Sequence, residues 1–232
     1  MAYERRRTSE VLKDGTEKTT CEYFKEDGTS GWGFQGVAKD VIFWTKKPGH
    51  MMRETHTHYS PEAPGVSNVL HEVCYHDDKG RMSERLYFGK DDRPVCNGFG
   101  TARQTYEYDA DGGRTIVLWA RPGGCLGGVK GLFREVSRYN AKGRLVEDVC
   151  FDENGGPAHF GGQRYAHRIC YTFDAMDQEI QEDRYRGQKD VRLFGADDDV
   201  WHIRLRKKGG KVLETLHYGQ DEKLVRVVRG MD

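Results

Sequence analysis

The chain has 232 residues, of which 36% are apolar and 32% are charged, and it contains 29 glycines. Its 37 basic residues balance 37 acidic ones, so the chain as a whole lacks the net positive field on which non-specific binding to nucleic acids and anionic membranes depends. This composition is typical of sheets and turns rather than of helical bundles.

Two features of the sequence indicate a cytoplasmic, reduced protein without membrane contacts. No window approaches the roughly 18 consecutive apolar residues of a transmembrane helix, and the charged N-terminal stretch MAYERRRTSE does not resemble an export signal. The six cysteines are widely spread and include no CxxC pair. Several of them lie within apparent strands, where a reduced thiol acts as a small apolar residue.

A repeat of about 32 residues organises the chain, and periods in this range mark repeat architectures. Equivalent turn positions follow one another at steps of 34, 31, 33, 30, 34 and 33 residues. In chain order these positions are Gly15, Gly49, Gly80, Gly113, Gly143, Asp177 and Gly210. Eight positions later, five units carry an aromatic residue: Tyr23, Phe88, Phe151, Tyr185 and Tyr218. We therefore treat residues 1–232 as a single repeat β domain.

Each unit is predicted to form a tight turn, a strand, a longer loop and a second strand. The turns DDKG, DADGG, NAKG and KKGG have the Gly, Asn and Asp residues that hairpins need for positive φ angles. The strand after Gly143 alternates between two faces, with Leu145, Glu147, Val149 and Phe151 on one of them. No segment has a helical period.

The fold class is therefore all-β, an antiparallel meander of about six to seven hairpins with about thirteen or fourteen strands. Short turns are expected at one edge and loops of about ten residues at the other. Because an apolar face must be covered, the sheet should form a coiled hairpin array, with a closed barrel or two packed layers as alternatives.

Three of the turns carry a resemblance to a known family. The motifs YHDDKGRM, YDADGGR and YNAKGRL resemble the YD repeat of bacterial RHS-type proteins, and DENGGP and KDDRP are similar to MORN-type hairpin repeats. The similarity extends from about Gly15 to Tyr218. In those families, the repeats form scaffolds that hold another polypeptide, and MORN-variant repeats occur as antitoxin partners. The resemblance thus implies a bacterial module that binds or neutralises a protein.

Three units share a glutamate four positions after the turn: Glu84, Glu147 and Glu214. By alternation, these carboxylates fall on the apolar face of their strands, where burial costs free energy unless they are hydrogen-bonded. Counting along the hairpins places Tyr108 near Glu84 and Tyr171 near Glu147, so we expect a structural ladder of glutamates and tyrosines. A ligand-binding acidic stripe is the alternative.

Four aromatic residues lie in or beside the longer loops: Trp32, Phe99, Phe160 and Phe194. Three of these loops contain several glycines, but a phosphate-binding loop should lead into a helix, and here each leads into a strand. The rings either plug the bends of the chain or stand in a row as a recognition surface for proteins or sugars. The sequence leaves both possibilities open.

Two irregular units carry the candidates for an enzymatic alternative. His56 and His58 point to the same face of a strand and could begin a zinc site, although no third ligand follows at motif spacing. Cys125, in the loop RPGGCLGG, could be a nucleophile without an identifiable histidine partner. A metal- or cysteine-dependent hydrolase is therefore the second hypothesis.

The leading hypothesis is a non-enzymatic module, without a cofactor, that binds a macromolecule, most plausibly a protein. Basic and aromatic residues interleave in RYAHRICYTF and WHIRLRKKGGK, as in proteins that bind single-stranded nucleic acids. The same arginines alternate with aspartates and glutamates, which favours cross-strand ion pairs on a solvated face over nucleic-acid binding. A carbohydrate-binding module is a further alternative, and the oligomeric state is left open.

Overall fold

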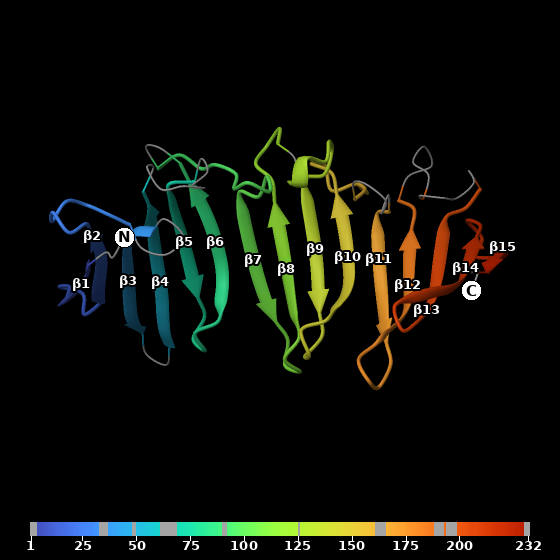
Figure 1. The fold of residues 1–232 in the computed structure, drawn as a ribbon, viewed down its shortest axis with the longest axis horizontal. Coiled ribbons are helices and arrows are strands. Elements are labelled where there is room, and N and C mark those ends of the chain that lie inside the picture. The colour runs from blue at the N-terminus through green and yellow to red at the C-terminus, as the bar shows by residue number, and fades with distance from the viewer. Residues whose placement is uncertain are drawn as a thin grey trace. The chain divides into compact units, whose positions relative to one another are not determined.

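A computed structural model describes residues 4–32, 37–47, 50–60, 69–89, 92–124, 126–160, 166–187, 193 and 199–229. These residues form fifteen strands and one 3₁₀ turn, and they contain no α-helix. The strands follow one another in the order of the chain, from β1 to β15 (Figure 1). The prediction of an all-β meander is confirmed, with more strands than expected. Since β1 and β15 each have one neighbour in this order, the sheet is not closed into a barrel.

The chain divides into two compact units, which we call the N-terminal unit (Met1–Tyr106) and the C-terminal unit (Glu107–Asp232). The strands that begin in the N-terminal unit are β1 (Glu4–Val11), β2 (Glu17–Phe24), β3 (Val37–Lys47), β4 (His50–Tyr59), β5 (His71–His76), β6 (Met82–Phe88) and β7 (Arg103–Tyr108). Those of the C-terminal unit are β8 (Arg114–Trp119), β9 (Arg134–Tyr139), β10 (Leu145–Phe151), β11 (Arg168–Phe173), β12 (Glu179–Tyr185), β13 (His202–Lys208), β14 (Lys211–Tyr218) and β15 (Leu224–Arg229).

The tight turns are closed by the residues that the repeat predicted. Between β9 and β10, the side-chain oxygen of Asn140 accepts hydrogen bonds from the backbone N–H groups of Lys142 and Arg144, at 3.0 Å each. Gly143 then adopts a φ of 75°, which a side chain would disfavour. The same arrangement recurs around Asp77 and Asp174, which bind the N–H groups two and four residues later. Local turn chemistry thus fixes where each hairpin reverses.

Two of the aligned positions differ by one residue from the predicted repeat. In the turn before β8, Gly112 rather than Gly113 has the positive φ, of 87°. Gly113 is required for another reason, because a Cβ atom there would lie 2.4 Å from the carboxylate of Asp109. In the first unit, the residue equivalent to Phe88 is Phe24 and not Tyr23. Phe24 and Phe88 each form a β-bridge to the residue six positions later.

The C-terminal unit has an apolar core on one face of its strands. The buried cluster consists of Ala120, Leu126, Leu132, Cys150, Ala158, Phe160, Ala166, Ile169, Leu193, Val200 and Ile203. Its members come partly from the strands and partly from the loops between them, so the loops cover this face of the sheet. The sequence pattern predicts the apolar face on the side of Glu147, and this prediction is wrong. The register shows that Asp148 and Cys150, the buried residues of β10 on the core face, lie on the side opposite Glu147.

The N-terminal unit buries a more polar set of side chains. Cys21, Cys74 and Tyr87 are buried on the same face of their strands as the half-buried Glu72 and Arg85. The hydroxyl of Tyr59 is hydrogen-bonded to Glu72, and burial followed by the negative charge of Glu72 raises the pKa of Tyr59 above its usual range. All the cysteines that the structure describes are free thiols. Burial raises the pKa of Cys150, which therefore acts as an apolar core residue.

Candidate binding surfaces

The face of the C-terminal sheet opposite the core cluster carries charged and aromatic side chains, and we call it the ladder face. Glu147 of β10 lies there and is directly opposite Arg138 of β9. Its carboxylate accepts a hydrogen bond from Arg138 and another from Arg168 Nε of β11, at 2.6 Å. Glu147 is only 8% exposed, so these two arginines supply the partners that a buried carboxylate needs.

The other two glutamates of the predicted row are also paired with arginine. Glu214 of β14 accepts a hydrogen bond from Arg206 Nη1 at 2.7 Å, and Glu84 of β6 in the N-terminal unit accepts one from Arg103 Nε at 2.6 Å. The predicted ladder of glutamates and tyrosines is therefore wrong in its partners, because an arginine binds each of the three glutamates. Tyr171 lies on the opposite face from Glu147, because Cys170 is the residue directly across from that glutamate. In the N-terminal unit, the tyrosine directly across from Glu84 is Tyr75, not Tyr108.

Asp183 of β12 forms the most extensively bonded site of the ladder face. Its carboxylate accepts hydrogen bonds from His202 Nε2 and Arg204 Nε, both at 2.7 Å, and from the amide of Gln181 at 2.6 Å. Burial alone would raise the pKa of this carboxyl, but the three hydrogen bonds outweigh burial and hold the pKa at about 2. Asp183 is therefore ionised at every physiological pH, as a fixed structural anion.

The sign of the charge on the ladder face alternates from one strand to the next. Basic side chains stand on β9, β11, β13 and β15, and acidic side chains stand on β10, β12 and β14. In that order from β9 to β15, the residues are Arg138, Glu147, Arg168, Asp183, Arg204 with Arg206, Glu214 and Arg229. Opposite charges on neighbouring strands attract and like charges destabilise, so this alternation stabilises the sheet, although the five arginines of the row outnumber its three carboxylates.

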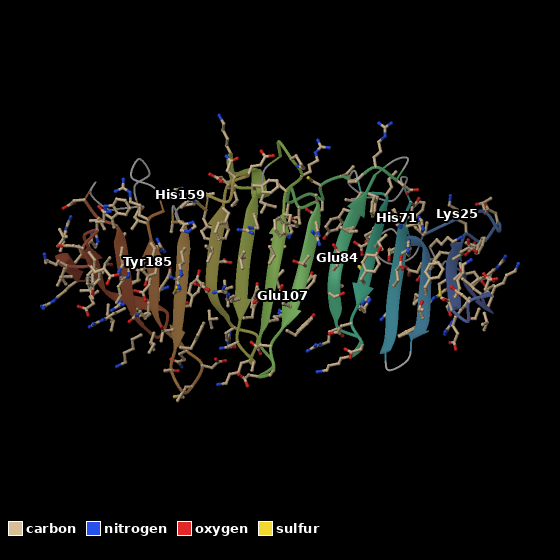
Figure 2. All side chains as sticks on the ribbon, turned by 180° about the vertical axis from the view of Figure 1, so that it is seen from behind. Lys25, His71, Glu84, Glu107, His159 and Tyr185 are labelled. Carbon is tan, nitrogen blue, oxygen red and sulfur yellow. The ribbon has the colours of Figure 1, made fainter. Side chains whose placement is uncertain are left out.

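Aromatic rings stack across the same face. His202 lies between Tyr185 and Tyr218, with ring centroids 4.4 and 4.8 Å away and the planes nearly parallel. Tyr185 is labelled in Figure 2, on β12. Toward β8, the guanidinium of Arg134 stands over the rings of Trp119 and Phe151, at 5.2 and 4.1 Å. The predicted aromatic repeat thus becomes a row of rings with cations between them, which is the residue chemistry enriched in protein interfaces.

Three histidines of the N-terminal unit, His56, His58 and His71, lie on the face that carries Glu84. The rings of His58 and His71 stack at 4.3 Å, and His56 Nδ1 lies 3.2 Å from His71 Nε2. An open groove of about 550 Å³ runs beside them, over Val41 and Phe43. Burial, followed by the neighbouring histidines and a lysine, lowers the pKa of His58, so its ring is neutral near pH 7. Figure 2 shows His71 and Glu84 on neighbouring strands of this unit.

Two of the three residues of the hydrolase hypothesis lie within the described ranges. His56 and His58 do share one face of β4, as the strand period predicted. Within the described ranges, however, no group of three His, Cys, Asp or Glu side chains is arranged to hold a metal ion. Cys125 lies outside the described residues.

The loop aromatics have different surroundings from one another. Phe99 is 77% exposed, whereas Phe160 is 8% exposed and belongs to the core cluster. Trp32 is half-buried, with Lys25 Nζ 5.5 Å from the centre of its ring. Phe194 lies outside the described residues. Of the three that can be placed, one plugs the core and one is free to make contacts.

Sequence reasoning missed His202, which binds Asp183, and the arginines that bind the glutamates of the acidic row. The signal was present, since equivalent positions of successive strands alternate in the sign of their charge when the hairpins are aligned.

No helix among the described residues has the length and apolar character needed to cross a bilayer. No family model matches the chain, and comparisons with curated proteins and with solved structures gave no match either.

Proposed function

We propose that the chain is a non-enzymatic binding module that recognises a protein through the ladder face of its C-terminal unit. The observation that carries this proposal is the row of stacked rings formed by Tyr185, His202 and Tyr218, set among paired charges. Tyrosine and arginine dominate the binding energy of protein interfaces because they combine large apolar area with polar groups.

The charge pairing of the ladder face supports a protein partner over a nucleic acid. Arg168 and Arg204 are both held by carboxylates of neighbouring strands, Glu147 and Asp183. A surface that binds phosphates needs cations that are available to replace counterions, and here acidic residues stand beside them. The pairing also holds the side chains in place before binding, which lowers the entropy cost of forming an interface.

The resemblance to antitoxin-associated hairpin repeats gives the partner a class, namely a toxin or effector protein that the module would hold or neutralise. On this proposal, the partner meets a pre-ordered surface of rings and paired charges. The expected interface is therefore of the standard protein type, with aromatic residues at the centre and charges around them.

The test begins with the tagged chain purified from its native host and with identification of any polypeptide that is retained in a fixed ratio. The identified partner is then produced separately, and its Kd is measured for the wild-type chain and for the double variant Tyr185→Ala/Tyr218→Ala. We expect the double variant to bind at least about tenfold more weakly, because two anchoring rings are lost.

The matched control is Phe99→Ala, which removes an exposed ring from a loop of the N-terminal unit. If the ladder face is the site, this variant should bind the partner as the wild type does. Loss of binding in Phe99→Ala with none in the tyrosine variant would move the site to the loops. Failure to retain any polypeptide, or retention of glycan or nucleic acid in its place, would overturn the proposal.

A further inference from the structure

Four side chains of the N-terminal unit form a continuous chain of polar contacts on the face that carries its three clustered histidines. In β4, His56 Nε2 contacts the carboxylate of Glu54, and His56 Nδ1 lies 3.2 Å from Nε2 of His71 in β5. On the far side, His71 Nδ1 lies 3.3 Å from a carboxylate oxygen of Asp92, in the loop after β6. Both nitrogens of each ring are therefore engaged, and a carboxylate stands at each end of the chain.

The contacts determine how many protons the two rings hold. An ionised carboxylate only accepts hydrogen bonds, so His56 Nε2 and His71 Nδ1 each carry a proton. The contact between His56 Nδ1 and His71 Nε2 requires one further proton, because two lone pairs or two N–H groups that face each other repel. Three protons on the two rings satisfy every contact. The pair then consists of one neutral imidazole and one imidazolium, and it carries a single positive charge.

The immediate surroundings favour one positive charge on this pair. Glu54 and Asp92 attract the charge from the two ends of the chain. The ring of His58 stacks on that of His71, with centroids 4.3 Å apart and planes inclined by 10°. Burial, followed by the neighbouring histidines, lowers the pKa of His58 and keeps this stacked ring neutral. A neutral aromatic ring stacked on an imidazolium stabilises its charge.

Charged side chains on the neighbouring strands of this face are held in ion pairs. These pairs are Glu10 with Lys18, Glu22 with Lys39, and Glu84 with Arg103. Tyr75 of β5 stands between Glu54 and Glu84, and burial followed by these two carboxylates raises its pKa, so its phenol is uncharged. Because unperturbed imidazoles titrate near pH 6.5, roughly, the histidines are the groups whose charge changes close to neutral pH.

Asp92 stands where equivalent loops have glycine. The residue four positions after the bridging phenylalanine is Gly28 in the loop after β2 and Gly155 in the loop after β10, and both have positive φ angles. At the equivalent position after Phe88, Asp92 adopts a φ of 52°. This conformation is less favourable for aspartate than for glycine. The aspartate adds what glycine lacks, namely a carboxylate that contacts His71.

We propose that Glu54, His56, His71 and Asp92 form a proton-dependent tether, in which the proton shared by the two histidines holds the loop at Asp92 on the N-terminal sheet. When the pH rises and the shared proton leaves, two protons remain for three contacts, and the contact with Asp92 is weakened. When the pH falls and a fourth proton enters, two N–H groups face each other and the rings separate. The tether is closed only between these two events.

The direct test is NMR of the full chain labelled at its histidine nitrogens, recorded from about pH 5 to pH 9, with signals assigned through His56→Gln and His71→Gln. Below the step at which the shared proton leaves, the two rings should together show three protonated nitrogens. The pair should lose this proton in one joint step, because the two rings are coupled. Independent titration of each ring from one proton to two would overturn the proposal.

The sharpest variant is Asp92→Gly, because glycine is the residue of the equivalent loops and the fold should be kept. Loss of the carboxylate should move the joint step to lower pH by at least about half a unit. The control Glu26→Gln removes one negative charge from an exposed position in the loop after β2, and it should leave the step within about 0.2 units of the wild type. Equal shifts in both variants would assign the effect to net charge and overturn the tether.

Release of the loop is measured by hydrogen exchange of residues 92–102 on the two sides of the joint step, after correction for the intrinsic effect of pH on exchange. In the wild type, we expect corrected exchange to be at least about threefold faster above the step. In Asp92→Gly, the corrected rate should be the same on both sides. Equal corrected rates in the wild type would overturn the role of the loop contact.

Metal analysis of the purified chain gives one more decisive result. Stoichiometric metal that is lost in His56→Gln and His71→Gln would overturn the proposal, because a coordinated nitrogen carries no proton. The tether lies in the N-terminal unit, and none of these measurements uses the protein partner. Its outcome is therefore separate from that of the proposed function, which Tyr185→Ala/Tyr218→Ala decides.

Discussion

The two units bury different kinds of side chain on the covered faces of their strands. In the C-terminal unit the cluster is aliphatic and small, and Ile169 and Cys150 have no exposed surface. In the N-terminal unit the same kind of face holds Glu72 and Arg85 beside Cys74. An apolar cluster gains free energy from every carbon it buries, whereas a buried ionic group must first recover the cost of leaving water.

This difference teaches that one repeat can support two kinds of core. The turns and the strand pairing are set by local residues and are common to both units. What fills the space under the loops is decided separately in each unit. The C-terminal unit should therefore respond most to the loss of apolar volume, and the N-terminal unit most to the loss of a charge partner.

The largest effect is expected from Ile169→Ala in the C-terminal unit. Removing a fully buried isoleucine side chain costs the lost burial and leaves a cavity, together about 3 to 4 kcal/mol in the free energy of unfolding. Hydrogen exchange resolved by peptide should show faster exchange in β10 to β13 and little change in β1 to β6. Uniform acceleration across both units would show that they unfold as one cooperative body.

A smaller effect is expected from Arg85→Leu in the N-terminal unit. Glu72 then loses the neighbouring positive charge, and we expect a loss of about 2 to 3 kcal/mol, measured by exchange in β4 to β6. The double variant Glu72→Gln/Arg85→Leu should recover part of this loss, because it removes both charges. A double variant less stable than the single one would show that packing of the arginine stem, rather than charge, is what matters.

The smallest of the three effects is expected from Asp183→Asn on the ladder face. The pKa of Asp183 lies at about 2, below its usual value of 3.8, so the ionised group stabilises the fold fully above about pH 4. The stabilisation, about 2 kcal/mol, is lost as the pH falls through the folded pKa. Urea unfolding at pH 7, 4 and 3 should show a gap between wild type and variant that narrows below pH 4. A gap that stays constant over this range would contradict the assignment.

The architecture could be predicted because its signals are local. The turn at Gly143 and the alternation from Glu147 to Phe151 depend on residues that are neighbours in the sequence, and both are confirmed. A β-bulge between Leu145 and Glu147 breaks the predicted alternation before that point. The covered face of β10 was assigned to the wrong side, because its two faces carry similar numbers of apolar residues and the loops that cover one of them are distant in sequence. One partner of Glu147 was missed for the same reason, since Arg168 comes from a different hairpin. Its other partner, Arg138, belongs to the same hairpin and follows from the local register.

The order of the strands has a consequence for how such a chain can change its length. Every strand of known register pairs with its neighbours in the sequence, so each hairpin depends only on the one before and the one after. A repeat contains two strands, and from β9 to β15 in the C-terminal unit the sign of the ladder charge also recurs every two strands. Duplication or loss of a whole repeat therefore preserves both the pairing and the charge order, whereas gain of a single strand would place like charges side by side. The array can grow in steps of one repeat without any redesign of its junctions.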